Sequence, residues 1–546
     1  MKNKFSYMLA LLFLMGASSC SDFLDIKPLD KMVLEDYWKT KGDVESVVLA
    51  CYRAMQEDAY MERVILGGEL RSDNVIVDES KLRTPSNVVL INDMTIKPSN
   101  TLLDWKSFYQ VINYCNTVLK YAPGVSEIDP NYTPGFMRAH LAEAYALRAL
   151  TYFYLVRLYR DVPYIDFPYT EDTQEFLVPQ TPGDTILHRM TEQLEEAEKY
   201  ALKSYGKSAL VWQKGRVTKN MIRALLADIY LWLGEYDKCI AACERVEPDI
   251  VGENDYLDPE LQTGAELRLV TNGVNGTMNV LQQLFYNGNS EESIFELQFS
   301  PTQKKNDRLV ALYGKDTDRQ LAAGPFEKYG KEGAENLFNE KDVRGITFFT
   351  PKYESGSAQG FSLIFKYIGM SLSLTADGTI SYAVFRNVDL TTPNWIFYRL
   401  ADIYLMKAEA LIERNQGDDL EQALELINVI YRRSQIDSQT SITPTDNTQE
   451  TYRTLLLEER QREFLFEGKR WFDLLRLARR EDKAGGGADS HPQMLNYVVR
   501  KYDYNGEVIK SKLLHTDALY LPIYENELSR NTSLKQNPYY STSSSR

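Results

Sequence analysis

Apolar residues recur every three or four positions along five stretches of the chain, the spacing that places them on one face of an α-helix. These stretches are residues 101–121, 136–160, 226–246, 400–433 and 450–480. The second stretch ends just before Asp161-Val162-Pro163, because proline disfavours helical conformation in the residue that precedes it. The pattern therefore predicts a mainly α-helical protein.

Six residues, Leu-Ala-Asp-Ile-Tyr-Leu, occur at 226–231 and again at 400–405. After the first copy, Gly234 stands at an offset typical of a tetratricopeptide unit, in which two helices pack side by side. Ala227 and Ala401 are small enough to let neighbouring helices approach closely. We therefore expect a tetratricopeptide-like helical-repeat scaffold.

Between residues 251 and 395 the helical spacing fades, and Gly, Asn, Thr and Pro become frequent. Short runs such as SIFELQFS (293–300) indicate strands. Because binding residues concentrate on loops that a rigid scaffold displays, this long irregular insertion is expected to carry the ligand surface. The predicted division of the chain is a leader at 1–19, an N-terminal helical region at 20–250, the insertion at 251–395 and a C-terminal helical region at 396–546.

The first twenty residues have the order of a bacterial export signal. A short positive segment precedes eleven apolar residues (5–15), too few to cross a bilayer comfortably, and four small residues follow. Cys20 comes next, so the segment resembles the lipobox of bacterial lipoproteins, with Ala17 where leucine is usual. An ordinary secretory leader with a chance cysteine is the alternative. We expect Cys20 to carry diacylglycerol and an N-acyl chain such as palmitate, a stable anchor because each buried methylene contributes about 0.8 kcal/mol.

The charge of the chain narrows the classes of partner. The formal net charge is −15, and loss of Lys2 and Lys4 with the leader makes it −17 (−15 − 2). A protein this acidic repels nucleic acid and anionic membrane surfaces. Neutral ligands are therefore expected.

The sequence carries few signs of catalysis or metal binding. Neither the five cysteines nor the four histidines have the spacing of a metal site, so no metal or cofactor is expected. Cys239 and Cys243, four positions apart, are interpreted as buried thiols on one helix face. The chain contains no GxSxG, HExxH or Walker phosphate loop. A glycosidase carboxylate pair is defined by its separation in space, so a secreted glycoside hydrolase stays open as an alternative.

Five motifs in order along the chain resemble the SusD/RagB family of nutrient-binding surface lipoproteins. They are SDFLDIKP (21–28), AEAYALRALTYFYLVRLYRDVPYI (142–165), LADIYLMKAEAL (400–411), LLLEERQREFLFEGKRWFDLLR (455–476) and LYLPIYENELSRNTSLKQNP (519–538). The last departs slightly from the family pattern, with Tyr524 where Pro is frequent and Tyr539 where Gly is frequent. The resemblance covers nearly the whole chain.

The resemblance implies a function as well as a fold. It implies a tetratricopeptide-like scaffold, a place at the outer membrane facing the cell exterior, and a SusC-like TonB-dependent transporter as partner. The expected ligand is an oligosaccharide or, in fewer members, a peptide, and the expected protein is not an enzyme. A repeat scaffold that binds only other proteins is a third possibility.

Two polar segments and a group of aromatic residues are the candidate ligand contacts. Residues 71–74 and 92–104 offer amides and carboxylates suited to sugar hydroxyls, with Asp73, Asn74 and Asn100 as the candidates. In the insertion, aromatic rings beside polar residues suit the C–H face of a sugar ring. These insertion candidates are Tyr286, Asn287, Tyr313, Tyr329, Tyr353 and Tyr382.

Other conspicuous residues are interpreted as structural. Arg148 lies on an apolar stripe and is expected in a buried ion pair between helices, since an unpaired buried charge is costly. Charges alternate at helical spacing in residues 458–476, which predicts an ion-paired, packed face that includes Arg470, Trp471 and Asp473. Trp105 is expected in the core.

Overall fold

The computed structural model describes most of the chain between residues 37 and 541. The described ranges are 37–79, 82, 86–170, 176–206, 209–246, 267–270, 280, 282–314, 320–324, 337–339, 341–348, 364–367, 370–374, 380–385, 392–435, 437, 439–486, 489–502 and 505–541. The leader and Cys20 lie outside these ranges, as do Tyr329 and Tyr353.

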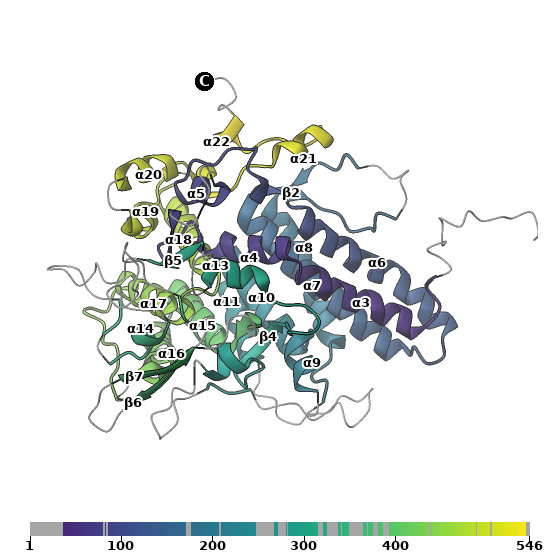
Figure 1. The fold of residues 1–546 in the computed structure, drawn as a ribbon, viewed down its shortest axis with the longest axis horizontal. Helices are drawn as coiled ribbons and strands as arrows, with labels where there is room; N and C mark the ends of the chain where they lie inside the picture. Colours follow the sequence, from purple (N-terminus) through teal and green to yellow (C-terminus); the bar gives the residue numbers. More distant parts are fainter. Residues whose placement is uncertain are drawn as a thin grey trace, which may run out of the picture.

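Long helices form the N-terminal part, and the longest of them lie on the right of Figure 1. The elements are α3 (Lys41–Met55), α4 (Asp58–Glu69), α5 (Asn87–Asn92), η3 (Thr101–Leu103), α6 (Lys106–Ile128), α7 (Pro134–Tyr159), α8 (Gly183–Tyr200), α9 (Leu210–Gly215), α10 (Lys219–Leu233) and α11 (Tyr236–Glu244). Helix α7 packs against α6 and α8 and is buried along most of its length, because apolar residues occupy nearly all of its sides.

Local sequence explains where these helices begin and end. The Thr40 hydroxyl accepts the Asp43 N–H (3.3 Å), and the Asp43 carboxylate accepts the Thr40 N–H (2.8 Å), so a capping box begins α3. Gly234 ends α10 with a φ of +77°, a conformation that glycine adopts without steric cost.

Helices also make up the C-terminal part, on the left and at the top of Figure 1. They are α15 (Leu400–Arg414), α16 (Asp419–Ser434), α17 (Gln449–Phe464), α18 (Arg470–Ala484), α19 (Pro492–Val498), η8 (Val499–Lys501), α20 (Gly506–Leu513), η9 (Thr516–Leu519), α21 (Glu525–Arg530) and α22 (Pro538–Ser541). The prediction of a mainly α-helical protein is confirmed.

The repeated hexapeptide lies in two helical hairpins that pack on each other. α10 packs against α11, α15 packs against α16, and α11 contacts α15. Ala227 and Ala401 are both fully buried in these seams. The tetratricopeptide-like arrangement predicted from the repeat is therefore confirmed.

Short strands and turns occupy the irregular part of the chain between α11 and α15. Its elements are η5 (a π-helical turn, Gln282–Asn287), β4 (Ser293–Leu297), α13 (Asp307–Tyr313), β5 (Leu321–Ala323), α14 (Arg344–Thr347), β6 (Met370–Leu374), β7 (Ile380–Phe385) and β8 (Trp395–Arg399). Strand β4 confirms the strand predicted within 293–300.

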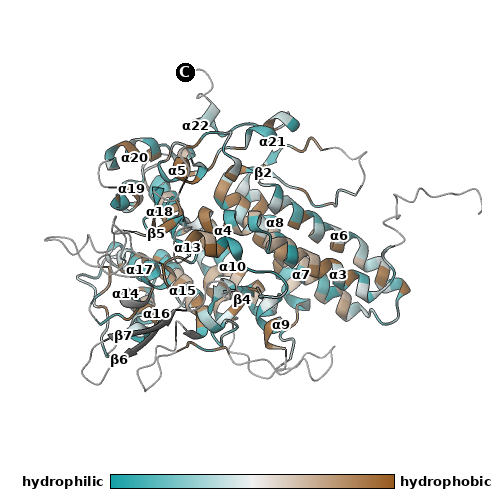
Figure 2. Ribbon diagram, in the orientation of Figure 1, coloured by the Kyte–Doolittle hydropathy of each residue, from teal (hydrophilic) through white to brown (hydrophobic). Residues whose placement is uncertain are grey.

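Within the described residues, four antiparallel pairs connect the strands. β1 (Val75–Val77) pairs with β5, β2 (Val162–Pro163) with β3 (Gln180–Thr181), β4 with β8, and β6 with β7. The β1–β5 pair fastens the irregular segment to the segment that precedes α5, and the β4–β8 pair joins two strands of the irregular segment itself. Hydrophobic and hydrophilic residues alternate along the helices in Figure 2, as expected for helices with one face in a common core.

Three further expectations can be compared with the structure. Trp105 is in the core, with its ring 5.2 Å from that of Tyr159. Cys239 and Cys243 are buried free thiols, as expected. The ion pair expected of Arg148 is wrong: its Nη1 and Nη2 donate to the side-chain amide oxygens of Asn116 (2.5 Å) and Gln193 (2.8 Å), which are neutral acceptors.

Within the described ranges, no helix combines the length and the apolar character that a membrane span requires.

Candidate ligand-binding surface

Asp73 and Asn74 belong to a buried polar network and do not face solvent. The Asp73 carboxylate holds Arg470 at two points, Nε to Oδ1 at 2.8 Å and Nη2 to Oδ2 at 3.0 Å. Gln461 Nε2 donates to Asp73 and to Asn74, both at 3.0 Å. Burial raises the pKa of Asp73, but the Arg470 charge outweighs it and leaves the pKa below its ordinary value. In this structure the candidate segment 71–74 therefore has a structural role, because it connects parts of the chain that are far apart in the sequence.

Asn100 is also used inside the protein. Its Oδ1 accepts the Leu102 N–H at 3.0 Å, which caps η3, and its Nδ2 donates to the Asn87 carbonyl at 3.0 Å. Only 2% of the residue is exposed. As with Asp73, other residues of the chain take up the polar groups of Asn100, and its expected ligand role stays a prediction.

Tyr313 lies in an aromatic column beneath the surface. Its ring stacks on Tyr367 at 6.0 Å with an interplanar angle of 12°, and Tyr367 stacks on Trp395 at 5.8 Å and 17°. Tyr313 is fully buried, so it cannot offer a ring face to a ligand. These stacked rings connect α13 to β8 and stabilise the packing of the irregular segment.

Tyr286 and Asn287 lie at the surface, on the last turn of η5. Asn287 is exposed and Tyr286 is half-buried. The preceding Phe285 packs its ring 5.4 Å from that of Tyr367, so the turn rests on the aromatic column. These two residues stay candidates. Tyr382 lies opposite Leu372 in the β6–β7 pair, and its side chain is outside the described part of the structure.

A buried carboxylate fixes the turn that follows Asn287. Gly288 and Asn289 have φ values of 68° and 53°, and Glu296 accepts the Asn289 N–H at 3.0 and 2.9 Å. Asn394 Nδ2 donates to the same carboxylate at 2.8 Å. Burial raises the pKa of Glu296 above its ordinary value, because a neutral carboxyl loses less solvation than a charged one. The buried Glu296 carboxylate thus fixes the backbone of the turn and is itself held by Asn394.

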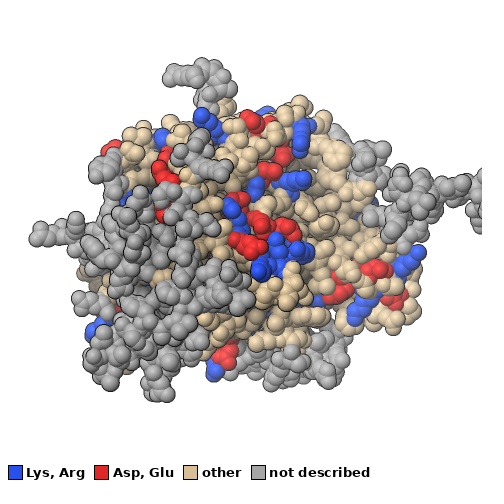
Figure 3. Space-filling view, in the orientation of Figure 1, with Lys and Arg blue, Asp and Glu red and all other residues tan. Residues whose placement is uncertain are grey.

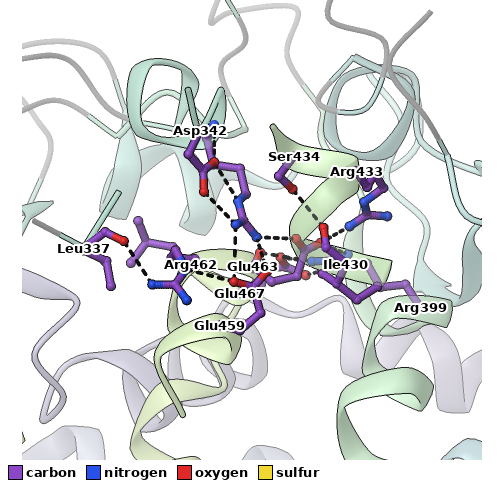
Figure 4. Close-up of polar contacts among 12 residues, drawn as sticks. Leu337, Asp342, Arg399, Ile430, Arg433, Ser434, Glu459, Arg462, Glu463 and Glu467 are labelled. Atoms are coloured by element: carbon purple, nitrogen blue, oxygen red, sulfur yellow. Dashed lines mark hydrogen bonds and ion pairs between the residues drawn. The ribbon is translucent and has the colours of Figure 1, made fainter. Parts of the chain in front are cut away.

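An ion cluster fastens the irregular segment to the C-terminal helices (Figure 4). Arg399 Nη1 reaches Glu463 (2.5 Å) and Glu292 (2.8 Å), and Arg344 Nη1 reaches Glu459 (2.8 Å) and Glu463 (2.9 Å). The members are Glu292, Asp342, Arg344, Lys366, Arg399, Arg433, Glu459, Arg462, Glu463 and Glu467. All are buried.

The charges of this cluster balance within the protein. The pKa of Glu463 is raised by burial but lowered further by Arg433, Arg399 and Arg344, and it ends well below its ordinary value. Each charge in a buried network of this kind is held by its partners, so removing one of them is costly. It confirms the ion-paired face predicted for 458–476, to which Arg460–Asp473 (2.8 Å) also belongs.

Figure 3 shows acidic and basic side chains close together near the middle of the face drawn. On α4, Asp58 pairs with Lys304 at 2.9 Å, and Glu62 pairs with Arg308. Acidic and basic groups alternate there. The described residues also contain no group of three or more His, Cys, Asp or Glu placed to hold a metal ion.

Exposed aromatic residues that the sequence analysis did not single out lie at two other places. Phe167 (40% exposed) and Phe176 (55% exposed) lie between β2 and β3, and Trp212 (53% exposed) lies on α9. Asn116 Nδ2 donates to the Phe167 carbonyl at 3.1 Å, which fixes the backbone there. A sequence signal did exist, since Leu210-Val211-Trp212 is an apolar run in a helix too short to bury all three side chains.

Comparison with family models gives two matches. A model described as the SusD family matches residues 352–540, and a model described as starch-binding associating with outer membrane matches residues 22–231. Together they reach both ends of the described structure.

Curated relatives match the chain over most of its length. SusD-like protein P38 of Formosa agariphila is 26% identical over 497 residues, which cover 87% of this chain and 91% of that protein. SusD-like protein P2 of the same bacterium is 25% identical over 553 residues, which cover 98% of this chain and 99% of that protein.

Solved structures share the fold. A SusD superfamily protein from Bacteroides thetaiotaomicron superposes with a TM-score of 0.65 at 20% identity, covering 92% of this chain and 99% of that one. A laminarin binding SusD-like protein superposes with a TM-score of 0.63 at 21% identity, covering 92% of this chain and 100% of that one. The fold, the family models and the curated relatives agree, and the chain belongs to the SusD/RagB family.

Proposed function

We propose that this protein captures oligosaccharides at the cell surface and delivers them to a SusC-like TonB-dependent transporter in the outer membrane. The family membership supports the general role. The observation that supports the ligand class is the turn at Tyr286 and Asn287, where a half-buried tyrosine and an exposed asparagine are adjacent in sequence and the preceding Phe285 packs on Tyr367. A ring face and a neutral amide are the groups that sugar C–H faces and hydroxyls require.

The distribution of charge favours a neutral ligand. Glu291, the charged residue closest in sequence to the turn, forms an ion pair with Arg268. Glu292 and Glu296 are buried and hydrogen-bonded. A charged ligand would need a counter-charge at the surface, whereas an oligosaccharide needs none. The laminarin named for one structural relative is a neutral glucan, and a ligand of the same class fits this surface.

Delivery requires that binding is reversible. A surface site with one or two ring contacts gains only modest energy per ring, so release toward the transporter is fast. The packed helical repeats make the scaffold rigid, so opening and closing over the barrel is a rigid-body movement of the whole protein about its lipid-anchored end at Cys20. No covalent step is involved in this function.

Calorimetry with the purified mature protein tests the proposal against its alternatives. The titrants are neutral hexaoses of glucose with β-1,3, β-1,4 and α-1,4 linkages, and chromatography examines the sugar recovered after long incubation. We expect binding of at least one hexaose, which is recovered intact. Shortened products would establish the glycoside hydrolase alternative. Absence of binding to every hexaose would contradict oligosaccharide capture and favour a peptide ligand or a protein-binding scaffold.

A further inference from the structure

Trp212 differs from every other tryptophan of this chain. The chain has six tryptophans, and all six are described. Trp38, Trp105, Trp232, Trp395 and Trp471 are at most 6% exposed. Trp212 is 53% exposed, and its neighbours Leu210 and Val211 are 41% and 53% exposed. A run of three exposed apolar residues is unfavourable in water unless a partner covers it.

The helix that carries Trp212 is held firmly by its second half. Gln213 Oε1 accepts the Tyr205 N–H at 2.7 Å, and Lys214 Nζ donates to the Ser293 carbonyl at 2.7 Å. Just after the helix, Arg216 forms an ion pair with Glu143 at 2.6 Å. The exposed half is therefore presented on a rigid base, and binding a partner there costs little conformational entropy.

A chain of contacts connects α9 with the turn at Asn287. Gly215 packs so closely on Gln298 that a Cβ there would lie 2.5 Å from Gln298 Cγ. Asn394 Nδ2 donates to Gln298 Oε1 at 3.1 Å, and a Cβ on Gly288 would lie 2.8 Å from Asn394 Nδ2. Trp212 precedes Gly215 by one helical turn, about 5 Å along the axis. The helix that carries Trp212 is thus connected to the Asn287 turn through Gln298 and Asn394.

The turn itself has an unfilled acceptor. Asn289 Oδ1 is buried and has no hydrogen-bond partner among the described residues. Asn289 is also in the left-handed region, where non-glycine residues are uncommon and often lie at functional sites. A hydroxyl donated from outside the protein would satisfy this oxygen.

From these contacts we infer that Trp212 is a stacking platform for a second sugar ring, so that one neutral oligosaccharide extends from the Asn287 turn to α9. The inference rests on the proposed function and adds a separate subsite to it. The indole offers a larger ring face than Tyr286, and the half-buried amides of Gln298 and Asn394 lie between the two platforms.

Tryptophan fluorescence tests this subsite directly, because Trp212 dominates quenching by acrylamide when the other five indoles are buried. The probe is whichever of the neutral hexaoses binds the full protein, together with its trisaccharide. We expect the saturating hexaose to protect Trp212 from acrylamide. Trp212→Ala should weaken hexaose binding about three- to tenfold, with a smaller effect on the trisaccharide, which spans less of the surface.

Phe176→Ala is the matched control, since Phe176 is equally exposed but lies between β2 and β3. It should leave hexaose affinity unchanged. Wild-type binding with neither protection of Trp212 nor loss in Trp212→Ala would overturn the subsite and leave the proposed function intact. A Trp212→Ala protein that binds hexaose normally but no longer associates with the transporter would instead assign α9 to the protein interface. Failure of the wild type to bind any hexaose would contradict both.

Discussion

Asp73 and Arg470, which are 397 positions apart in the chain, form a buried ion pair with two hydrogen bonds of 2.8 and 3.0 Å. Asp73 follows α4 and Arg470 begins α18, so the pair joins the N-terminal helices to the C-terminal ones. Both side chains are at most 1% exposed. Because this ion pair is buried, it stabilises one position of the N-terminal helices relative to the C-terminal ones.

Removing one partner should therefore be costly. Asp73→Asn leaves the Arg470 charge buried with its carboxylate gone, and we expect the free energy of unfolding to fall by about 3–5 kcal/mol. Urea denaturation followed by circular dichroism measures it. Glu425→Gln is the control, because the Arg432–Glu425 pair is exposed and should contribute under about 1 kcal/mol. Equal effects of the two substitutions would mean that burial of the Asp73 pair has no consequence.

The helical repeat makes its own prediction. Ala227→Leu and Ala401→Leu should each lower the free energy of unfolding by about 1–3 kcal/mol. Both alanines are fully buried between packed helices, and the larger leucine side chain would force the helices apart. Thermal melting measures the loss. Ala241→Leu, at an exposed position on α11, should leave the melting temperature nearly unchanged. Unchanged melting for both seam variants would contradict close packing at the repeat.

The carboxylate of Glu45 makes stability depend on acid pH. Burial raises its pKa, but a hydrogen bond with His140 and the charge of Arg216 lower it from 4.5 to about 2. Because the folded pKa is depressed, the stabilisation is complete above pH 4.5 and is lost as the pH falls toward 2. Glu45→Gln should cost about 1–3 kcal/mol at pH 7, with the difference from wild type vanishing near pH 2. A difference that stays constant between pH 7 and pH 2.5 would rule out this linkage.

The lipid anchor is predicted from the sequence alone. Cys20→Ala should release the protein from membranes into the soluble fraction, because the acyl chains that hold it can no longer be attached. Fractionation after a high-salt wash, followed by immunoblotting, measures the distribution. A Cys20→Ala protein that stays in the membrane pellet would show that something other than the lipid provides the main attachment.

Residue spacing was enough to predict the helices, the repeated hairpin, the strand at 293–297 and the ion-paired face around Arg460 and Asp473. These features depend on neighbours within one or two helical turns, and sequence reports such neighbours directly. Burial of Trp105 was predictable for the same reason.

Long-range pairing could not be predicted in this way. Nothing near Asp73 in the sequence indicates that Arg470 will pair with it. For this reason a polar segment with a structural role resembled a ligand site. Tyr313 resembled a stacking residue because its neighbours are polar, yet Tyr367 and Phe466 cover its ring. Trp212 is exposed because α9 is short, and the spacing of apolar residues did not predict the length of this helix.

Hydrogen–deuterium exchange with and without a saturating neutral hexaose tests the central claim most directly, because it locates the ligand on the intact protein. The account predicts that protection on binding concentrates at residues 282–289 and 210–216, while 71–74 and 92–104 exchange as in the free protein. Protection confined to 71–74 or 92–104, or absent from the Asn287 turn while calorimetry records binding, would contradict it.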